Sequence, residues 1–108
     1  MDIGYARIST SDQSMDMQTD ALRAAGVKEI FEDIGSGVRA NREGLEQLLK
    51  YVRHGDTVVV WRLDRLGRSL RHLVELIAAL QTRNVGFKSL QENINTETAS
   101  GKLFLHIF

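Results

Sequence analysis

The sequence contains no cysteine and no proline, and aromatic residues make up only 6% of its 108 positions. Without cysteine, disulfide scaffolds, thiolate nucleophiles and cysteine-based zinc sites are all excluded. Apolar runs are only a few residues long, so none can span a bilayer as a helix. The first residues also lack the basic start and apolar stretch of a secretion signal. We therefore expect one soluble, intracellular domain.

A net charge of either sign is also missing, because 14 Lys and Arg balance 14 Asp and Glu. The charges are nevertheless unevenly placed. Residues 1–38 hold three basic and seven acidic side chains, and residues 39–72 hold eight basic and four acidic. Arginine suits sites where a planar fork grips phosphate oxygens, although an arginine-rich run also fits a solvated helix face. Four arginines fall within ten positions: Arg62, Arg65, Arg68 and Arg71.

Hydrophobic periodicity predicts four strands that alternate with three helices. The strands are expected over residues 3–8, 28–32, 57–61 and 85–90, and loops are expected over residues 33–41, 63–68 and 93–100. The first helix follows a capping box at Thr10–Gln13 and ends at Gly26, the second begins after Asn41, and Ser69 caps the third. The third helix has a predicted core stripe of Leu70, Leu73, Val74, Ile77 and Leu80. This order predicts an α/β fold, a three-layer sandwich with a largely parallel sheet of four to five strands.

Two segments carry residues suited to chemistry at the carboxyl edge of that sheet. Tyr5, Arg7 and Ser9 share one face of the first strand, because residues two apart point the same way. The segment Leu63–Arg68 follows the buried third strand and holds arginines, an aspartate and a glycine. Ligands of open α/β sheets bind at this edge, so the arginines are candidates to clamp a phosphate. Buried structural residues and a surface ion-pair turn remain the alternatives for each segment alone.

Together the two segments, Tyr5-Ala-Arg-Ile-Ser9 and Leu63-Asp-Arg-Leu-Gly-Arg68, closely resemble the serine recombinases, the resolvase and DNA-invertase family. The resemblance runs from Ile3 to the last residue, and the two motifs at this spacing are highly specific. Supporting matches are Asp12-Gln13 with Gln18, Phe31-Glu-Asp33 with Ser36-Gly37, Arg42 with Gly44-Leu45, and Gly55-Asp56.

The resemblance implies a role for each matching residue. Ser9 matches the nucleophile that attacks a DNA phosphodiester and becomes linked to the 5′ phosphate. Asp64 matches an aspartate proposed to help protonate the leaving group. Arg7, Arg65 and Arg68 match the arginines around the scissile phosphate, and Arg42 matches a further arginine that contacts phosphate. From the arginine cluster, Arg71 is also expected to bind DNA. Supporting active-site positions are Tyr5, Gln13, Gln18 and Asp33.

The expected reaction needs no cofactor, ATP or metal, because the phosphoserine ester stores the broken bond. Serine must still lose its proton, and no histidine lies near Ser9 in the sequence, so the general base is unassigned. We interpret His54, His72 and His106 as ordinary helix residues.

The resemblance also implies partners and a missing part. We expect residues 1–108 to be the catalytic domain, truncated where a long oligomerisation helix starts, since residues 102–108 are strongly apolar. The helix-turn-helix DNA-binding domain that the resemblance implies is expected to lie outside residues 1–108. The full-length protein is expected to act on double-stranded DNA as a homodimer or homotetramer, without a membrane, in the bacterial cytoplasm at the nucleoid. Resolvase, invertase and transposon-borne relatives are not separated by these motifs.

Three other functions would make different demands on the sequence. A serine hydrolase would need a Ser-His-Asp arrangement or a Gly-x-Ser-x-Gly elbow, and Ser9 has neither around it. A metal-dependent nuclease would need clustered carboxylates, for which Asp33 and Asp64 are candidates if they converge. A catalytically incompetent dimerisation or DNA-binding fragment is the alternative of a different class. It predicts that Ser9→Ala leaves all activity intact.

Overall fold

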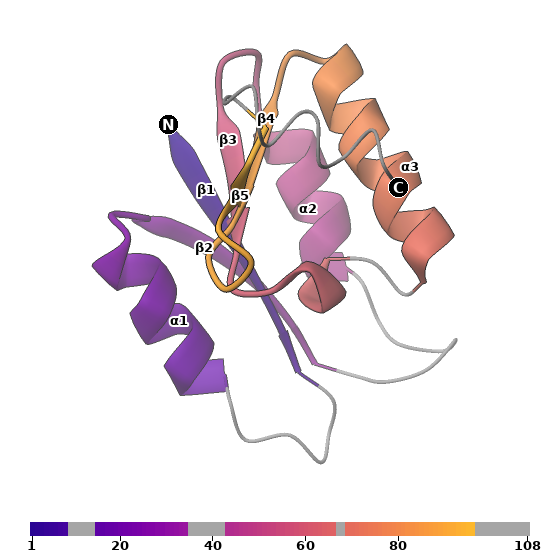
Figure 1. The fold of residues 1–108 in the computed structure, drawn as a ribbon. Coiled ribbons are helices and arrows are strands. Elements are labelled where there is room, and N and C mark those ends of the chain that lie inside the picture. The colour runs from indigo at the N-terminus through magenta and orange to yellow at the C-terminus, as the bar shows by residue number, and fades with distance from the viewer. Residues whose placement is uncertain (9–14, 35–42, 67–68, 97–108) are drawn as a thin grey trace.

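A computed structural model of the chain describes residues 1–8, 15–34, 43–66 and 69–96 (Figure 1). Its centre is a five-stranded sheet in the order β2-β1-β3-β4-β5. The first four strands of that sheet are parallel, and β5 pairs with β4 in the antiparallel direction. The strands are β1 (Asp2–Ile8), β2 (Glu29–Ile34), β3 (Thr57–Val60), β4 (Gly86–Ser89) and β5 (Ile94–Asn95).

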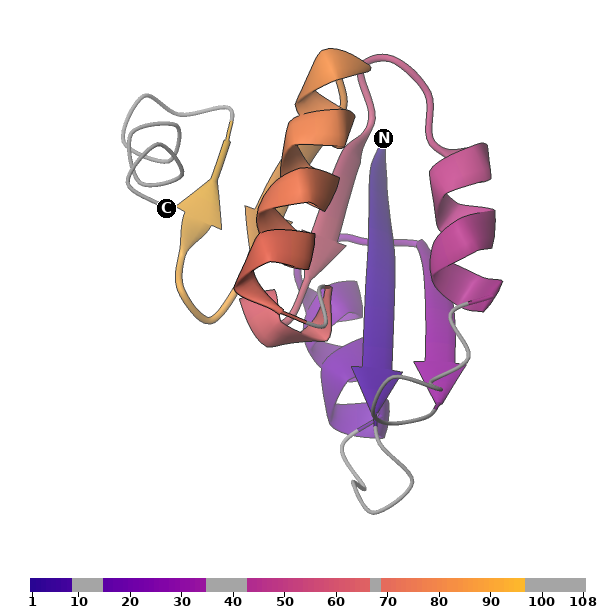
Figure 2. The same ribbon diagram turned by 90° about the vertical axis from the view of Figure 1, so that its right-hand side faces the viewer.

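Helices cover both faces of the sheet, as the alternating pattern predicted. Helix α1 (Met15–Ala24) lies on one face, and α2 (Glu43–Tyr51) and α3 (Leu70–Thr82) lie on the other (Figures 1 and 2). The strand alternation explains the two cores. Tyr5 belongs to the core beneath α2 and α3, whereas its neighbour Ala6 belongs to the smaller core beneath α1. The predicted three-layer α/β sandwich is therefore confirmed.

The N-cap of α3 was predicted correctly, but not every residue of its predicted core stripe is buried. The Ser69 hydroxyl accepts a hydrogen bond from the His72 N–H at 3.1 Å, so the predicted N-cap is present. Leu73, Ile77 and Leu80 are buried as expected, but Leu70 is 56% exposed. The buried side of α3 begins one turn into the helix, since Leu66 fills the core just before it.

Four local predictions need correction. Strand β2 continues through Ile34, so Asp33 lies in a strand and not in a loop. A short 3₁₀ helix, η1 (Leu63–Arg65), follows β3 where a loop was predicted. Strand β5 lies within the segment predicted as a polar loop. Its composition does not indicate a strand, and it becomes one by pairing with β4. His54 lies in the turn after α2 and not in a helix.

The turn that joins α2 to β3 is held by the carboxylate of Asp56. This carboxylate accepts a hydrogen bond from the Arg53 N–H at 2.9 Å and lies 3.3 Å from the N-terminal ammonium of Met1. Both contacts lower the pKa of Asp56 below its ordinary value of 3.8, the backbone hydrogen bond most strongly. Asp56 precedes β3, so it belongs to the amino edge of the parallel strands.

Among the described helices, none is long and apolar enough to cross a membrane.

Candidate functional site at the carboxyl edge of the sheet

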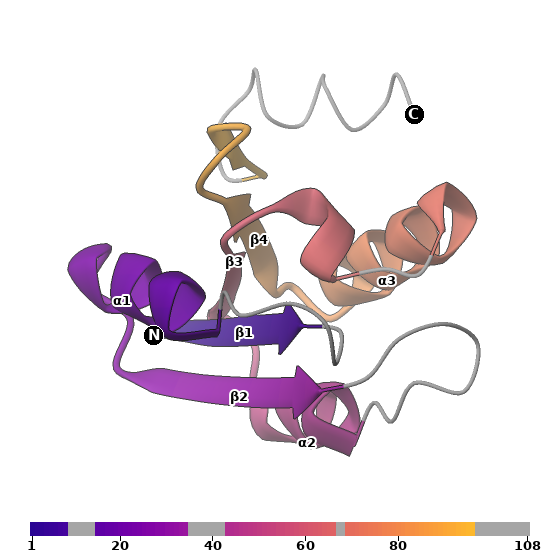
Figure 3. The same ribbon diagram turned by 90° about the horizontal axis from the view of Figure 1, so that it is seen from below.

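Strand register brings the end of β1 against the segment that follows β3. Tyr5 pairs with Val60, the last residue of β3, so Arg7 extends beyond the end of that strand. The end of β1 contacts η1 there, and the two segments lie next to each other in the view from below (Figure 3). Two segments that are far apart in the sequence therefore lie together at the edge where α/β sheets bind ligands.

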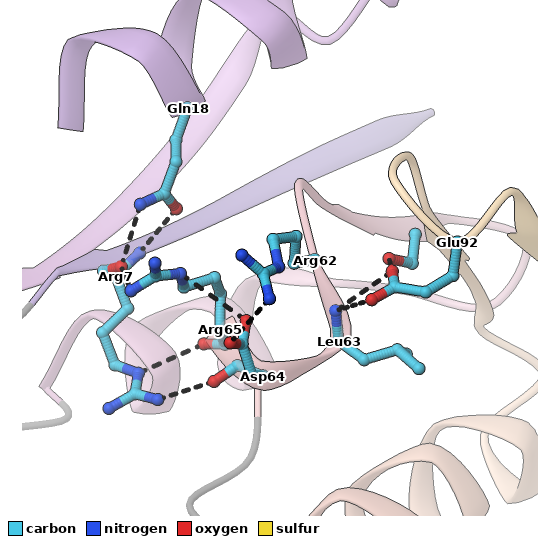
Figure 4. A network of polar contacts seen from close by, with 8 residues as sticks. Arg7, Gln18, Arg62, Leu63, Asp64, Arg65 and Glu92 are labelled. Atoms are coloured by element: carbon cyan, nitrogen blue, oxygen red, sulfur yellow. Dashed lines mark hydrogen bonds and ion pairs between the residues drawn. The ribbon is translucent and has the colours of Figure 1, made fainter. Parts of the chain in front are cut away.

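Arg7 and Arg65 hold each other's backbone in place (Figure 4). The Arg7 guanidinium donates from Nη2 to the Asp64 carbonyl at 2.8 Å and from Nε to the Arg65 carbonyl at 3.3 Å. In return, Arg65 Nη1 donates to the Arg7 carbonyl at 3.3 Å. A guanidinium has more N–H donors than the two bonds that Arg7 makes within the described residues. This edge can therefore present N–H donors to an anion.

Gln18 of α1 fixes the backbone of Arg7 from the other side. Its carboxamide Nε2 donates to the Arg7 carbonyl at 3.0 Å, and its Oε1 accepts from the Arg7 N–H at 3.3 Å (Figure 4). The Gln18 side chain is fully buried, and a buried carboxamide without partners would be costly. These two hydrogen bonds fix the Arg7 backbone relative to α1, and with it the point from which the Arg7 side chain extends.

Asp64 lies between two arginines on the exposed side of η1. Its carboxylate is 3.6 Å from Arg62 Nη2 and 3.6 Å from Arg65 Nε. Both guanidinium groups also lie over the Trp61 ring, with centroid distances of 5.4 Å for Arg62 and 5.8 Å for Arg65. The arginines of this segment are thus oriented by an aromatic face and a carboxylate. This is more order than a solvated helix face requires.

Tyr5 and Asp33 form a separate, buried group that anchors α2. The Tyr5 hydroxyl donates to Asp33 Oδ2 at 2.6 Å, and the N–H groups of Gly44 and Leu45 donate to the same carboxylate at 2.7 and 3.0 Å. Asp33 therefore caps the start of α2 from strand β2. A Cβ atom at Gly44 would lie 2.4 Å from the Glu32 carbonyl, so this close approach requires glycine.

Two polar residues that sequence reasoning missed also contact this edge. The Glu92 carboxylate accepts from the Leu63 N–H at the start of η1 (Figure 4), and Ser89 Oγ donates to Glu92. Glu92 lies 29 positions from Leu63, in a segment with no recognisable motif. No signal in the sequence could have linked the two.

Several predicted residues lie apart from this network. Arg71 is 90% exposed on α3 and pairs with Glu75, its neighbour one turn along the helix, at 3.1 Å. The predicted residues that fall outside the described part of the chain are Ser9, Gln13, Arg42 and Arg68.

Carboxylates do not gather into a metal site within residues 1–8, 15–34, 43–66 and 69–96. No group of three His, Cys, Asp or Glu side chains suited to a metal ion occurs in these ranges. Asp33 is engaged by Tyr5 and the start of α2, whereas Asp64 is engaged by Arg62 and Arg65. The two aspartates that a metal-dependent nuclease would have used therefore have separate partners.

The chain matches the family model described as "Resolvase, N terminal domain" over residues 2–108. It is 53% identical to the DNA-invertase hin of Salmonella typhimurium over 97% of this chain and 55% of that protein. It is 47% identical to the transposon Tn552 resolvase of Staphylococcus aureus over 100% of this chain and 56% of that protein. The chain thus spans about half the length of these curated relatives.

A solved structure supports the same relationship. The N-terminal catalytic domain of TP901-1 integrase matches with a TM-score of 0.79 and 32% identity, covering 99% of this chain and 90% of that one. The sequence match, the shared fold and the family model agree, and the chain belongs to the resolvase N-terminal domain family of serine recombinases.

Proposed function

We propose that this chain is the catalytic domain of a site-specific DNA recombinase that cuts and rejoins duplex DNA through Ser9. The observation that carries the proposal is the pair Arg7 and Arg65, held side by side through each other's backbone. Like charges repel, so bringing two guanidinium groups to one edge costs free energy. The Asp64 carboxylate beside Arg65 offsets part of this cost, and an anion bound at this edge would offset more. A DNA phosphate supplies such an anion, and guanidinium groups match its oxygens in geometry.

The proposed reaction is an in-line displacement at phosphorus. The Ser9 hydroxyl gives up its proton and its Oγ attacks, the bond from phosphorus to the 3′ oxygen breaks, and the 3′ oxygen leaves as a hydroxyl after gaining one proton, so that no net proton is consumed. The product is an ester between Ser9 and the 5′ phosphate. Attack by a 3′ hydroxyl reverses these steps and restores Ser9, so the bond is rejoined without ATP. Negative charge grows on the non-bridging oxygens in the transition state, where fixed arginines stabilise it.

The remaining residues are assigned by what surrounds them or by the family match. Asp64 is proposed to help protonate the leaving 3′ oxygen while its ion pairs orient Arg62 and Arg65. Gln18 is proposed to set the position of Arg7. Tyr5 and Asp33 are proposed to support the site through α2. Further phosphate contacts and supporting contacts are assigned from the family match to Arg42, Arg68 and Gln13. Arg71 is proposed to contact the DNA because it belongs to the same arginine cluster.

The partners proposed are double-stranded DNA and further copies of the same protein. Strand exchange requires both strands of two sites to be cut, so the full-length protein is proposed to act as a homodimer or homotetramer at the bacterial nucleoid. The relatives named above are about twice as long as this chain. The remaining half is proposed to carry the oligomerisation helix and the DNA-binding domain.

Trapping of a covalent adduct tests the proposed chemistry. The chain is joined to the part of DNA-invertase hin beyond the matched region, giving a protein that we call the joined chain. It is incubated with a nicked duplex carrying the recombination site of that invertase. We expect a DNA–protein adduct that is stable to denaturation and is lost in Ser9→Ala. Ser69→Ala, which removes a hydroxyl that caps α3, is the matched control and keeps the adduct.

Four outcomes would contradict the proposal. An adduct that persists in Ser9→Ala, or no adduct from the joined chain at all, would remove Ser9 as the nucleophile. Cleavage that is abolished by EDTA would favour a metal-dependent nuclease. DNA binding without an adduct, unchanged by Ser9→Ala, would favour a catalytically incompetent dimerisation or DNA-binding module.

A further inference from the structure

The turn between β4 and β5 lies against the segment that carries the arginines of the candidate site. Strand β4 ends at Ser89, but the pairing continues, because Leu90 N–H donates to the Val60 carbonyl at 3.0 Å and Gln91 N–H donates to the Trp61 carbonyl at 2.9 Å. The chain then turns back at Asn93, which has a positive φ of 55° and donates to the Leu90 carbonyl at 3.3 Å. Glu92 is thereby held in a tight turn beside the start of η1.

The Glu92 side chain makes one specific connection from this turn. Both of its carboxylate oxygens lie 3.3 Å from the Leu63 nitrogen (Figure 4), and the Ser89 hydroxyl donates to Oε1. Arg62, at the N-cap position of η1, makes no side-chain capping hydrogen bond. Helices leave their first N–H groups without backbone partners, and a carboxylate is the strongest side-chain acceptor for them. Glu92 therefore caps η1 from another element.

The contact between Glu92 and Leu63 also affects Arg7, through the two residues that follow Leu63 in the chain. Leu63 is followed directly by Asp64 and Arg65, whose carbonyls accept the two hydrogen bonds of the Arg7 guanidinium. A shift of Leu63 would move these carbonyls and the Arg65 side chain together. We infer that Glu92 is a positioning residue of the recombinase site, acting through η1 to hold Arg7 and Arg65 in their relative placement. This inference rests on the proposed function for its catalytic part only.

The inference is tested first on η1 itself, without any assay of cleavage. Hydrogen exchange of the Leu63 amide is measured by NMR in the 108-residue chain for wild type, Glu92→Ala and Glu92→Gln. We expect the alanine variant to lower the protection of this amide about tenfold, since a hydrogen bond to a charged group is lost. Glutamine keeps an acceptor oxygen and retains most of the protection. Gln91→Ala, an exposed neighbour that pairs through its backbone, is the control and leaves it unchanged.

The second test measures cleavage and DNA affinity in the joined chain. We expect Glu92→Ala to slow adduct formation about ten- to a hundredfold, as misplacement of a supporting group does. Its dissociation constant for DNA stays within about threefold of wild type, because the arginines remain present. Glu92→Gln restores most of the rate. Ser89→Ala removes the hydroxyl bound to Glu92 and slows adduct formation less, by about threefold. This variant takes the place of the Glu92 variants where those are too unstable to purify.

The outcomes separate this inference from the proposed function. The inference alone is overturned if the wild-type joined chain is active and Glu92→Ala changes neither the exchange of the Leu63 amide nor the rate of adduct formation. Where Ser89→Ala is used in place of the Glu92 variants, the same result in Ser89→Ala overturns the inference. A wild-type joined chain that forms no adduct would overturn the proposed function, and the exchange data would still decide whether Glu92 holds η1. Equal losses of rate and of global stability in the alanine and glutamine variants would assign Glu92 a purely structural role and overturn its positioning role.

Discussion

At the scale of single residues, the buried polar groups beside the site have exchanged water for fixed partners in the protein. Asp33 shows this most directly, because its buried carboxylate accepts hydrogen bonds from the Tyr5 hydroxyl and from two backbone N–H groups of α2. A buried carboxylate needs such donors, since an isolated charge in the interior is costly. The Tyr5 hydroxyl is the one side-chain donor among these three bonds, so its removal tests the arrangement.

We expect Tyr5→Phe to lower the free energy of unfolding by about 2 kcal/mol, because a hydrogen bond to a buried charged group is lost while the ring packing is kept. Urea unfolding of the 108-residue chain measures the change. Tyr51→Phe is the matched control, since Tyr51 is 44% exposed and its ring contact with Phe31 does not need the hydroxyl. Equal stability of the two variants would show that the Tyr5 hydroxyl does not support Asp33.

At the scale of elements, α2 depends on partners from outside the helix at both ends. It has nine residues, and an isolated helix of that length is marginal in water. The Asp33 carboxylate accepts from its first N–H groups. The Arg83 guanidinium, just after α3, donates to the carbonyls of Leu49 and Val52 at 2.8 and 3.0 Å. A carboxylate at the start and a guanidinium at the end also oppose the helix dipole.

We expect Arg83→Ala to destabilise the chain by about 1–2 kcal/mol, because two hydrogen bonds to the end of α2 are lost. Thermal and urea unfolding measure the loss, and hydrogen exchange of the last amides of α2 locates it. Arg23→Ala, an exposed arginine in the last turn of α1, is the control and changes stability by less than about 0.5 kcal/mol. Faster exchange spread evenly over the whole chain would contradict a local role.

The same scale explains what the sequence can predict. Period-two and helical patterns are written into local residues, so the four parallel strands and three helices were predicted to within a few residues. The rule that ligands bind at the carboxyl edge correctly brought Arg7 and Asp64 to one place. Strand β5 was missed because its order comes from pairing with β4. The contacts of Asp33 with α2 and of Glu92 with η1 were missed because they join elements through tertiary structure.

At the scale of the whole molecule, the distribution of charge indicates that stabilising the proposed reaction and holding the DNA are separate tasks. Lys and Arg equal Asp and Glu in number over the chain, and the cationic excess lies in residues 39–72. Affinity for a polyanion comes mainly from the number of phosphates that basic side chains neutralise. A few arginines at one sheet edge can stabilise a transition state without holding the duplex. The part of the relatives that this chain does not span is therefore expected to supply most of the affinity.

We expect the purified 108-residue chain to bind duplex DNA more weakly than a dissociation constant of about 10⁻⁴ M at physiological salt, the weak end of non-specific binding. It is expected to give no recombination product, whereas the joined chain binds and reacts. Fluorescence anisotropy with a labelled duplex measures affinity over a range of salt concentrations, and a plasmid inversion assay measures product. The salt dependence should be shallow for the short chain, because few counterions are released. Recombination by the short chain alone would refute this division of labour and place the whole activity within residues 1–108.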